Sequence, residues 1–102
     1  MDAEFTISIG LNDQHTHQQE ISTDRALSIV MDAFGDCTIQ ICAGRYTHDD
    51  GTVVEERSLR VYVYADSAEV DRLAGICKRL KAVLNQESIV ISWRPCGDTL
   101  FI

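Results

Sequence analysis

Basic residues are scarce in this sequence, and so are long apolar runs. Lys and Arg together number 9 against 16 Asp and Glu, which gives a formal charge of −7. This balance opposes the electrostatic attraction that dominates binding to nucleic-acid backbones, so we expect no direct DNA or RNA partner. No apolar run approaches the roughly 18 residues of a membrane helix, and the N-terminus lacks the basic and apolar regions of a signal peptide. We therefore expect a cytoplasmic protein with no membrane partner.

Proline and closely spaced cysteines are also lacking. Pro95 is the single proline, and the four cysteines, Cys37, Cys42, Cys77 and Cys96, contain no C-x-x-C pair. In a reducing cytosol we expect free thiols that mostly fill apolar space, and no disulfide framework. With 102 residues the chain is long enough for one core, which predicts a single domain over residues 1–102.

Hydrophobic periodicity predicts the order of the elements. Apolar and polar residues alternate over 5–11, 36–46, 52–65 and 88–93, whereas apolar residues recur at helical spacing over 26–34 and 70–84. The order βαββαβ, with a short extra C-terminal strand over 99–102, is that of an α+β ferredoxin-like fold. We expect an antiparallel sheet in the order 4-1-3-2 with both helices on one face.

Polar residues and glycines mark the expected helix ends. Ser22 or Thr23 can accept a hydrogen bond at the start of the first helix, and Gly35 is a stop signal at its end. Asp66 and Glu69 have the spacing of a capping box for the second helix. These signals predict two helices of several turns each.

The polar stretch His48-Asp49-Asp50-Gly51 lies between the second and third predicted strands. Asp50-Gly51 favours a two-residue hairpin loop, because both central positions then need positive φ. A solvated hairpin tip does not perturb a pKa as acid–base catalysis requires. We interpret these residues as a turn, and we expect His48 to lie far from the first loop.

The face of the sheet opposite the helices is expected to be open. Such a mixed aromatic and polar face favours association of copies, so we expect a homodimer or larger assembly. An RNA-recognition motif would place stacking aromatics at Tyr62 and Tyr64, but Ser8 stands where the first strand should carry one. The residues projected onto the open face are Thr6, Ser8, Thr38, Gln40, Cys42, Arg60, Tyr62, Tyr64, Val90, Ser92 and Arg94.

A wider pattern supports the same architecture. "GRYTHDDGTVVEERS", followed about thirty residues later by "LNQESI", resembles a small bacterial and phage domain family of unknown function. The positions that carry the resemblance are Gly44, Tyr46, Gly51, Glu56, Ser58 and Gln86 to Ser88, with "GLND" at 10–13. The resemblance implies a phage-type protein acting in the host cytoplasm, and it transfers no catalytic or binding residue.

Side chains on the two hairpin strands form the candidate ligand site. Arginine binds anions and tyrosine stacks on planar groups, although cross-strand ion pairs with Glu55 or Glu56 explain the arginines equally well. The predicted ligand-binding residues are Arg45, Tyr46, Glu56, Ser58, Arg60, Tyr62 and Arg94. We expect no catalytic residue, no metal and no cofactor.

Histidines and cysteines offer weaker alternatives. His15 and His17 have a spacing found in metal sites, but two ligands do not make a site, so a solvated loop is the preferred interpretation. Cys77 and Cys37 are expected in the core. Cys42 and Cys96 are the remaining candidates for reactivity, with no histidine implied nearby to activate them.

Three functions are compatible with these features. The preferred hypothesis is a non-enzymatic phage-type inhibitor of host defence that sequesters a nucleotide-like signal or, like anti-CRISPR proteins, binds a basic host protein. The second is a small enzyme with an inter-subunit pocket using Tyr62, Tyr64, Cys42 or Glu56, and the third is a structural interaction module. The acidic residues expected to contact a basic protein are Asp13, Glu20, Asp49, Asp50, Glu55 and Glu56.

Overall fold

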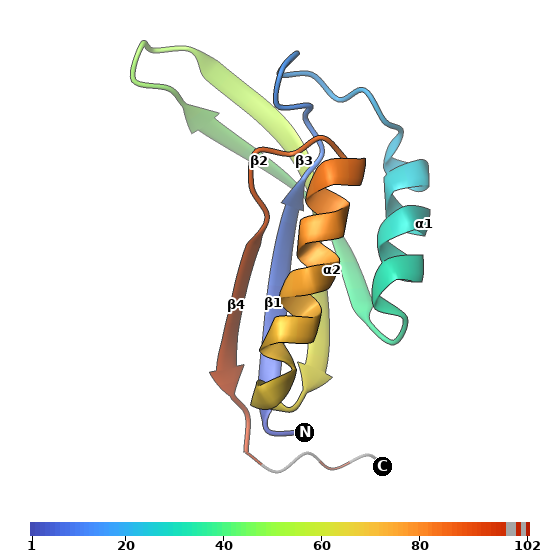
Figure 1. Cartoon of the computed structure of the whole chain (residues 1–102). Coiled ribbons are helices and arrows are strands. Elements are labelled where there is room, and N and C mark those ends of the chain that lie inside the picture. Colours follow the sequence, from blue (N-terminus) through green and yellow to red (C-terminus); the bar gives the residue numbers. More distant parts are fainter. Residues whose placement is uncertain (98–99, 101) are drawn as a thin grey trace.

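The computed structural model describes residues 1–97, 100 and 102, and it has the predicted α+β architecture. Its sheet is antiparallel in the order β2-β3-β1-β4, and both helices lie on the same side of it (Figure 1). This confirms the ferredoxin-like topology. Part of the predicted C-terminal strand, residues 99 and 101, lies outside the described residues. The elements are β1 (Ala3–Gly10), α1 (Thr23–Phe34), β2 (Thr38–Thr47), β3 (Val53–Ala65), a 3-10 turn (Ser67–Glu69), α2 (Val70–Val83) and β4 (Val90–Pro95).

The predicted helix caps are present. Ser22 Oγ accepts a hydrogen bond of 3.1 Å from the Arg25 N–H, and Gly35 ends α1 with φ of 71°. The Asp66 N–H donates to Glu69 Oε2 over 3.0 Å. This contact precedes a 3-10 turn, so α2 itself begins only at Val70. No helix in the described part of the chain is long and apolar enough to cross a membrane.

The core lies between the sheet and the two helices. Phe5, Ile7 and Ile9 of β1 have no exposed surface, and they share the core with Leu59 of β3 and Leu73 of α2. Burying a side chain of this size contributes about 1.5–3 kcal/mol, so this layer supplies most of the favourable free energy of folding.

Two large apolar residues that strand alternation assigns to the helix side of the sheet are half exposed. Ile41 is 53% exposed and Trp93 is 49% exposed. Both lie on edge strands, where cover is incomplete, and Trp93 stacks on Phe5 with ring centroids 5.7 Å apart. Strand alternation therefore assigned the correct face, but it could not show how far the helices cover it.

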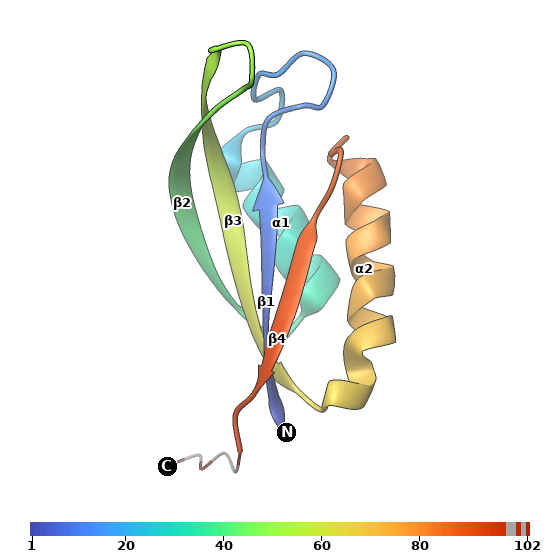
Figure 2. The ribbon, with the colours of Figure 1, turned by 90° about the vertical axis from the view of Figure 1, so that its left-hand side faces the viewer.

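Beyond the core, β2 and β3 continue as a hairpin arm, which we define as residues 43–57. β1 pairs with β3 as far as Gly10 opposite Ser58, and past this point β2 and β3 pair only with each other, up to Thr47 opposite Val53. The arm projects past the helices (Figure 1). At its tip the chain passes close to the loop between β1 and α1 (Figure 2).

The tip of the arm differs from the predicted two-residue loop. The His48 N–H donates to the Thr52 carbonyl over 2.8 Å, which leaves three residues in the loop. Gly51 has φ of 87°, whereas Asp50 does not have positive φ. This is the three-residue hairpin in which one glycine takes the left-handed position. The dipeptide located the turn correctly but not its length.

Candidate functional site

Two hollows lie at the base of the arm, one on each face. Because side chains alternate along strands, Tyr46, Glu56 and Ser58 point to the open face, whereas Arg45 and Arg57 point to the helix side. We call the open-face hollow, of about 340 Å³, the Tyr46 hollow, and the helix-side hollow, of about 560 Å³, the Arg57 hollow. The Tyr46 hollow is lined by Ser8, Gly10, Asn12, Asp13, Gln14, His17, Tyr46, His48, Glu56, Ser58, Gln86, Glu87, Ser88 and Val90.

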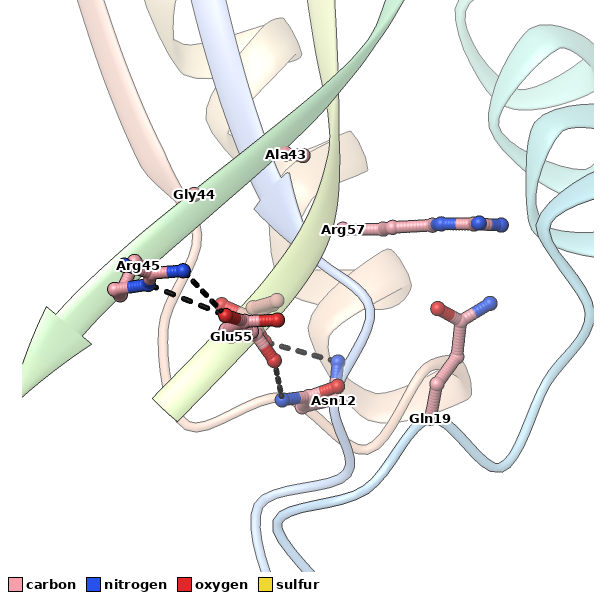
Figure 3. Close-up of a pocket in the computed structure, with 8 residues that line it drawn as sticks. Asn12, Gln19, Ala43, Gly44, Arg45, Glu55 and Arg57 are labelled. Carbon is pink, nitrogen blue, oxygen red and sulfur yellow. Dashed lines mark hydrogen bonds and ion pairs between the residues drawn. The ribbon is translucent and has the colours of Figure 1, made fainter. Parts of the chain in front are cut away.

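The Arg57 hollow contains an exposed ion pair and few other polar interactions between its side chains. Its strongest interaction is the ion pair between Arg45 and Glu55, 2.7 Å apart, and both side chains are 70% exposed. Figure 3 shows Arg57 extending away from β3 on the side where Gln19 lies. An exposed pair of this kind contributes at most about 1 kcal/mol. The cross-strand ion pair considered for Arg45 is therefore present, and it lies on the opposite face from Tyr46.

Glu56 is the charged group that the arm contributes to the Tyr46 hollow. Its Oε2 accepts a hydrogen bond of 2.9 Å from the Asn12 N–H, just past the end of β1. The carboxylate lies directly over Gly10, since a Cβ on that glycine would be 2.7 Å from both carboxylate oxygens. A glycine at the end of β1 therefore gives a partly buried carboxylate the space to reach across from β3.

A network around Asp13 builds one side of the hollow. The Asp13 carboxylate accepts hydrogen bonds from Asn85 Nδ2 over 2.6 Å and from the N–H groups of His15 and Thr16 over 2.8 and 3.1 Å. These bonds, that from Asn85 foremost, lower the pKa of Asp13 below its ordinary value. The β1–α1 loop is thereby joined to the end of α2.

Gln86 links the residues after α2 to the start of the β1–α1 loop. Its side chain is 6% exposed, and its Nε2 donates to the Asn12 carbonyl over 2.6 Å. This bond holds the connection between α2 and β4 against the end of β1. Residues 86–88 are therefore brought beside Glu56, although about thirty positions separate them in sequence.

Three rings stand at one side of the Tyr46 hollow, and we call them the ring corner. Tyr46 and His48 meet edge to face with centroids 5.3 Å apart, and His48 meets His17 in the same manner at 6.5 Å. The expectation that His48 lies far from the first loop is thus wrong. The loop folds back toward the tip of the arm because the Asp13 network holds it there, and sequence separation gave no sign of this.

The predicted ligand-binding residues divide into three groups. Tyr46, Glu56 and Ser58 line the Tyr46 hollow, and Arg45 lies on the other face. The rest, Arg60, Tyr62 and Arg94, lie further along the open face and outside the residues that line the hollow.

Two of the outer residues have partners of their own. The Tyr62 hydroxyl donates to Gln40 Oε1 over 3.1 Å, and Arg94 pairs with Glu4 at 3.1 Å. The hydrogen bond and charge of Glu4 raise the pKa of Arg94 further above its ordinary value. These side chains hold neighbouring strands together, away from the hollow.

Sequence reasoning missed Gly10, Asn12, Asp13 and His17 as residues of the site. The signals available were the glycine at the end of the first strand and the "GLND" segment that follows it. Neither signal by itself indicates a ligand site, because Gly10 and Asn12 join the site only through their contacts with Glu56 of β3.

Comparisons with known proteins bear on the fold. In sequence, neither a family model nor a curated protein matches the chain. In structure, it is similar to a phage SAM lyase in complex with S-methyl-5'-thioadenosine, with a TM-score of 0.73, 16% identity and coverage of 92% of this chain and 81% of that chain. A phage SAM lyase in the apo state matches with a TM-score of 0.72, 17% identity and coverage of 92% and 80%.

These matches correct one prediction. The fold of this chain is also the fold of an enzyme, so the prediction of a non-enzymatic protein is contradicted. That prediction relied on small size and on the lack of an acid–base pair in the sequence. Neither excludes catalysis on this fold.

Proposed function

We propose that this protein is a phage-type enzyme that binds S-adenosylmethionine in the Tyr46 hollow and cleaves it as a lyase, releasing S-methyl-5'-thioadenosine. The observation that carries the proposal is the convergence of three distant segments on one hollow. Tyr46 and Glu56 come from the arm and Ser58 from β3 next to it, Gly10 and Asn12 come from the end of β1 and the loop after it, and residues 86–88 come from the connection between α2 and β4. The structural similarity to the phage SAM lyase supports the choice of ligand.

The charge of the hollow fits this ligand better than a phosphorylated nucleotide. Its lining residues include Asp13, Glu56 and Glu87, and no Lys or Arg among the described residues. S-adenosylmethionine carries a sulfonium and an ammonium cation, which carboxylates attract, whereas phosphate groups would be repelled. Of the nucleotide-like ligands expected from the sequence, we therefore propose a cationic nucleoside and no phosphorylated one.

Cleavage without water places a simple demand on the protein. In a balanced route, the carboxylate of the substrate attacks its own γ-carbon, a C–O bond forms, and the C–S bond breaks. The bonding pair passes to sulfur, so the sulfonium becomes the neutral thioether and the remaining fragment is a lactone. No proton is exchanged with the protein, so the protein's part is to bind and fold the substrate.

In this scheme Glu56 binds and orients the substrate. The sulfonium loses its charge in the transition state, so a carboxylate placed against it would stabilise the substrate more than the transition state. We therefore assign the Glu56 carboxylate to the hydroxyl or ammonium groups of the ligand, with Asn12 fixing its orientation. Removal of S-adenosylmethionine would act against host defences that depend on this methyl donor.

Substitution of Glu56 tests the proposal. Glu56→Gln keeps an amide oxygen that can accept the Asn12 N–H but removes the charge, and Glu55→Gln is the matched control because Glu55 faces the Arg57 hollow. With purified protein and S-adenosylmethionine, we expect release of S-methyl-5'-thioadenosine, a loss of at least about 100-fold in kcat/KM for Glu56→Gln, and little change for Glu55→Gln. Circular dichroism checks the fold of each variant.

Two outcomes would contradict the proposal. One is that the wild-type protein forms no S-methyl-5'-thioadenosine. The other is that both glutamine variants lose activity equally, because activity would then not depend on the face that Glu56 occupies.

A further inference from the structure

The ring corner lies where a flat ligand group entering the Tyr46 hollow would meet it. All three rings, Tyr46, His48 and His17, belong to the lining of the hollow. Their edge-to-face contacts hold each ring against the next, so the corner is formed before any ligand binds. Rings held in this manner lose little conformational freedom on binding.

His17 occupies its place at the cost of an unfavourable backbone conformation. Its φ is 59°, in the left-handed region that few non-glycine residues adopt. Asn85, with φ of 49°, is the other such residue among the described residues, and its side chain holds Asp13. The His17 N–H donates to the Asp13 carbonyl over 2.9 Å. Both strained residues therefore serve the loop that carries His17 toward the arm.

Strained residues of this kind are found where the surrounding structure requires a side chain at a particular point. His15, two residues earlier, is exposed as His17 is, but it is not part of the lining. The loop thus places one of two exposed histidines at the hollow and the other outside it.

We propose that His17, His48 and Tyr46 bind the adenine base of the ligand, and that His17 and His48 determine specificity for the purine. This inference rests on the proposed function for the identity of the ligand. Stacking of a base on an aromatic ring needs only the two flat faces, so aromatic rings beside the hollow suffice. The carboxylate of Glu56 then lies on the same side of the sheet for the ribose or the amino-acid portion.

Ligands with and without the base distinguish this role. S-methyl-5'-thioadenosine carries adenine, and S-methyl-5-thioribose lacks it. The variants are His48→Ala and His17→Asn, since asparagine tolerates positive φ and removes the ring, with His15→Asn as the matched control. Isothermal titration calorimetry measures both ligands against all four proteins.

We expect His17→Asn and His48→Ala each to weaken S-methyl-5'-thioadenosine binding by about 5-fold to 100-fold, the range for loss of one stacked base. His15→Asn should bind as the wild type does, and S-methyl-5-thioribose should bind all four proteins alike.

If the wild type and both ring variants bind S-methyl-5'-thioadenosine equally well, this inference is overturned while the proposed function is not. It is also overturned if the ring variants weaken S-methyl-5-thioribose by the same factor, since the rings would then not act on the base. Absence of wild-type binding would instead contradict the proposed function, and this inference with it.

Discussion

Strands β2 and β3 run through both the helix-covered half of the sheet and the arm, yet different interactions hold them in the two places. In the covered half, Leu59 and Val61 of β3 have no exposed surface. In the arm, Val53 of the same strand is 57% exposed, and polar contacts such as that of Glu56 with Asn12 take the place of a core. Stability is therefore concentrated in one half, and the polar groups available to a ligand in the other.

Matched substitutions of isoleucine sharpen this contrast most strongly. Ile7 has no exposed surface, and Ile41 is 53% exposed near the base of the arm. Ile7→Ala should lower the free energy of unfolding by about 2–5 kcal/mol because it leaves a cavity, whereas Ile41→Ala should change it by less than about 1 kcal/mol. Urea unfolding followed by circular dichroism measures both. Equal losses would show that the half-exposed edge of β2 contributes as much to stability as the core does.

Substitution of glycine separates binding from stability at the end of β1. In Gly10→Ala the new methyl would meet the Glu56 carboxylate, which is the flexible end of a side chain and can move away. We expect S-methyl-5'-thioadenosine binding to fall by at least about tenfold, with the free energy of unfolding changed by less than about 1 kcal/mol.

Gly44→Ala is the control for this experiment, because the nearest atom to its added Cβ is the Glu56 carbonyl oxygen at 4.0 Å. It should leave affinity unchanged. If Gly10→Ala also binds normally, the position of Glu56 does not govern the site.

The smallest expected effect is on the pKa of Asp13. Its titration tests whether the hydrogen bond from Asn85 holds the loop that carries His17. The folded-state pKa of Asp13 lies below its ordinary 3.8, so its contribution to stability is fully present above that pH and is lost as the pH falls through the lower folded value. Asn85→Gly removes the largest cause while keeping a residue that accepts positive φ. NMR titration of the Asp13 carboxyl should then show its pKa rising toward the ordinary value. An unchanged pKa would mean that the Asn85 hydrogen bond does not hold the loop.

The fold could be predicted from the sequence because its signals are local or periodic. The alternation of Phe5, Ile7 and Ile9 and the cap at Ser22 depend only on neighbouring residues, and both agree with the structure. The length of the hairpin loop was mistaken because Asp50 does not take the positive φ that its dipeptide tolerates.

The site could be predicted only in part. Tyr46, Glu56 and Ser58 were predicted as ligand-binding residues of the hairpin strands, but the approach of His17 to His48 depends on the contact of Asp13 with Asn85, 72 positions apart. No local pattern encodes such a contact. Membership of the bacterial and phage domain family and association of copies through the open face stay predictions.

The central claim is that the open face at the base of the arm is the ligand site of this protein. Chemical-shift mapping of the backbone amides, with S-methyl-5'-thioadenosine added stepwise, tests it most directly. We expect saturable shifts at Tyr46, Glu56 and Ser58 and at residues 86–88, with Gln19 and Ala43 of the Arg57 hollow and the outer faces of the helices unchanged. Shifts confined to the Arg57 hollow or the helices, or no shifts at all, would contradict the account.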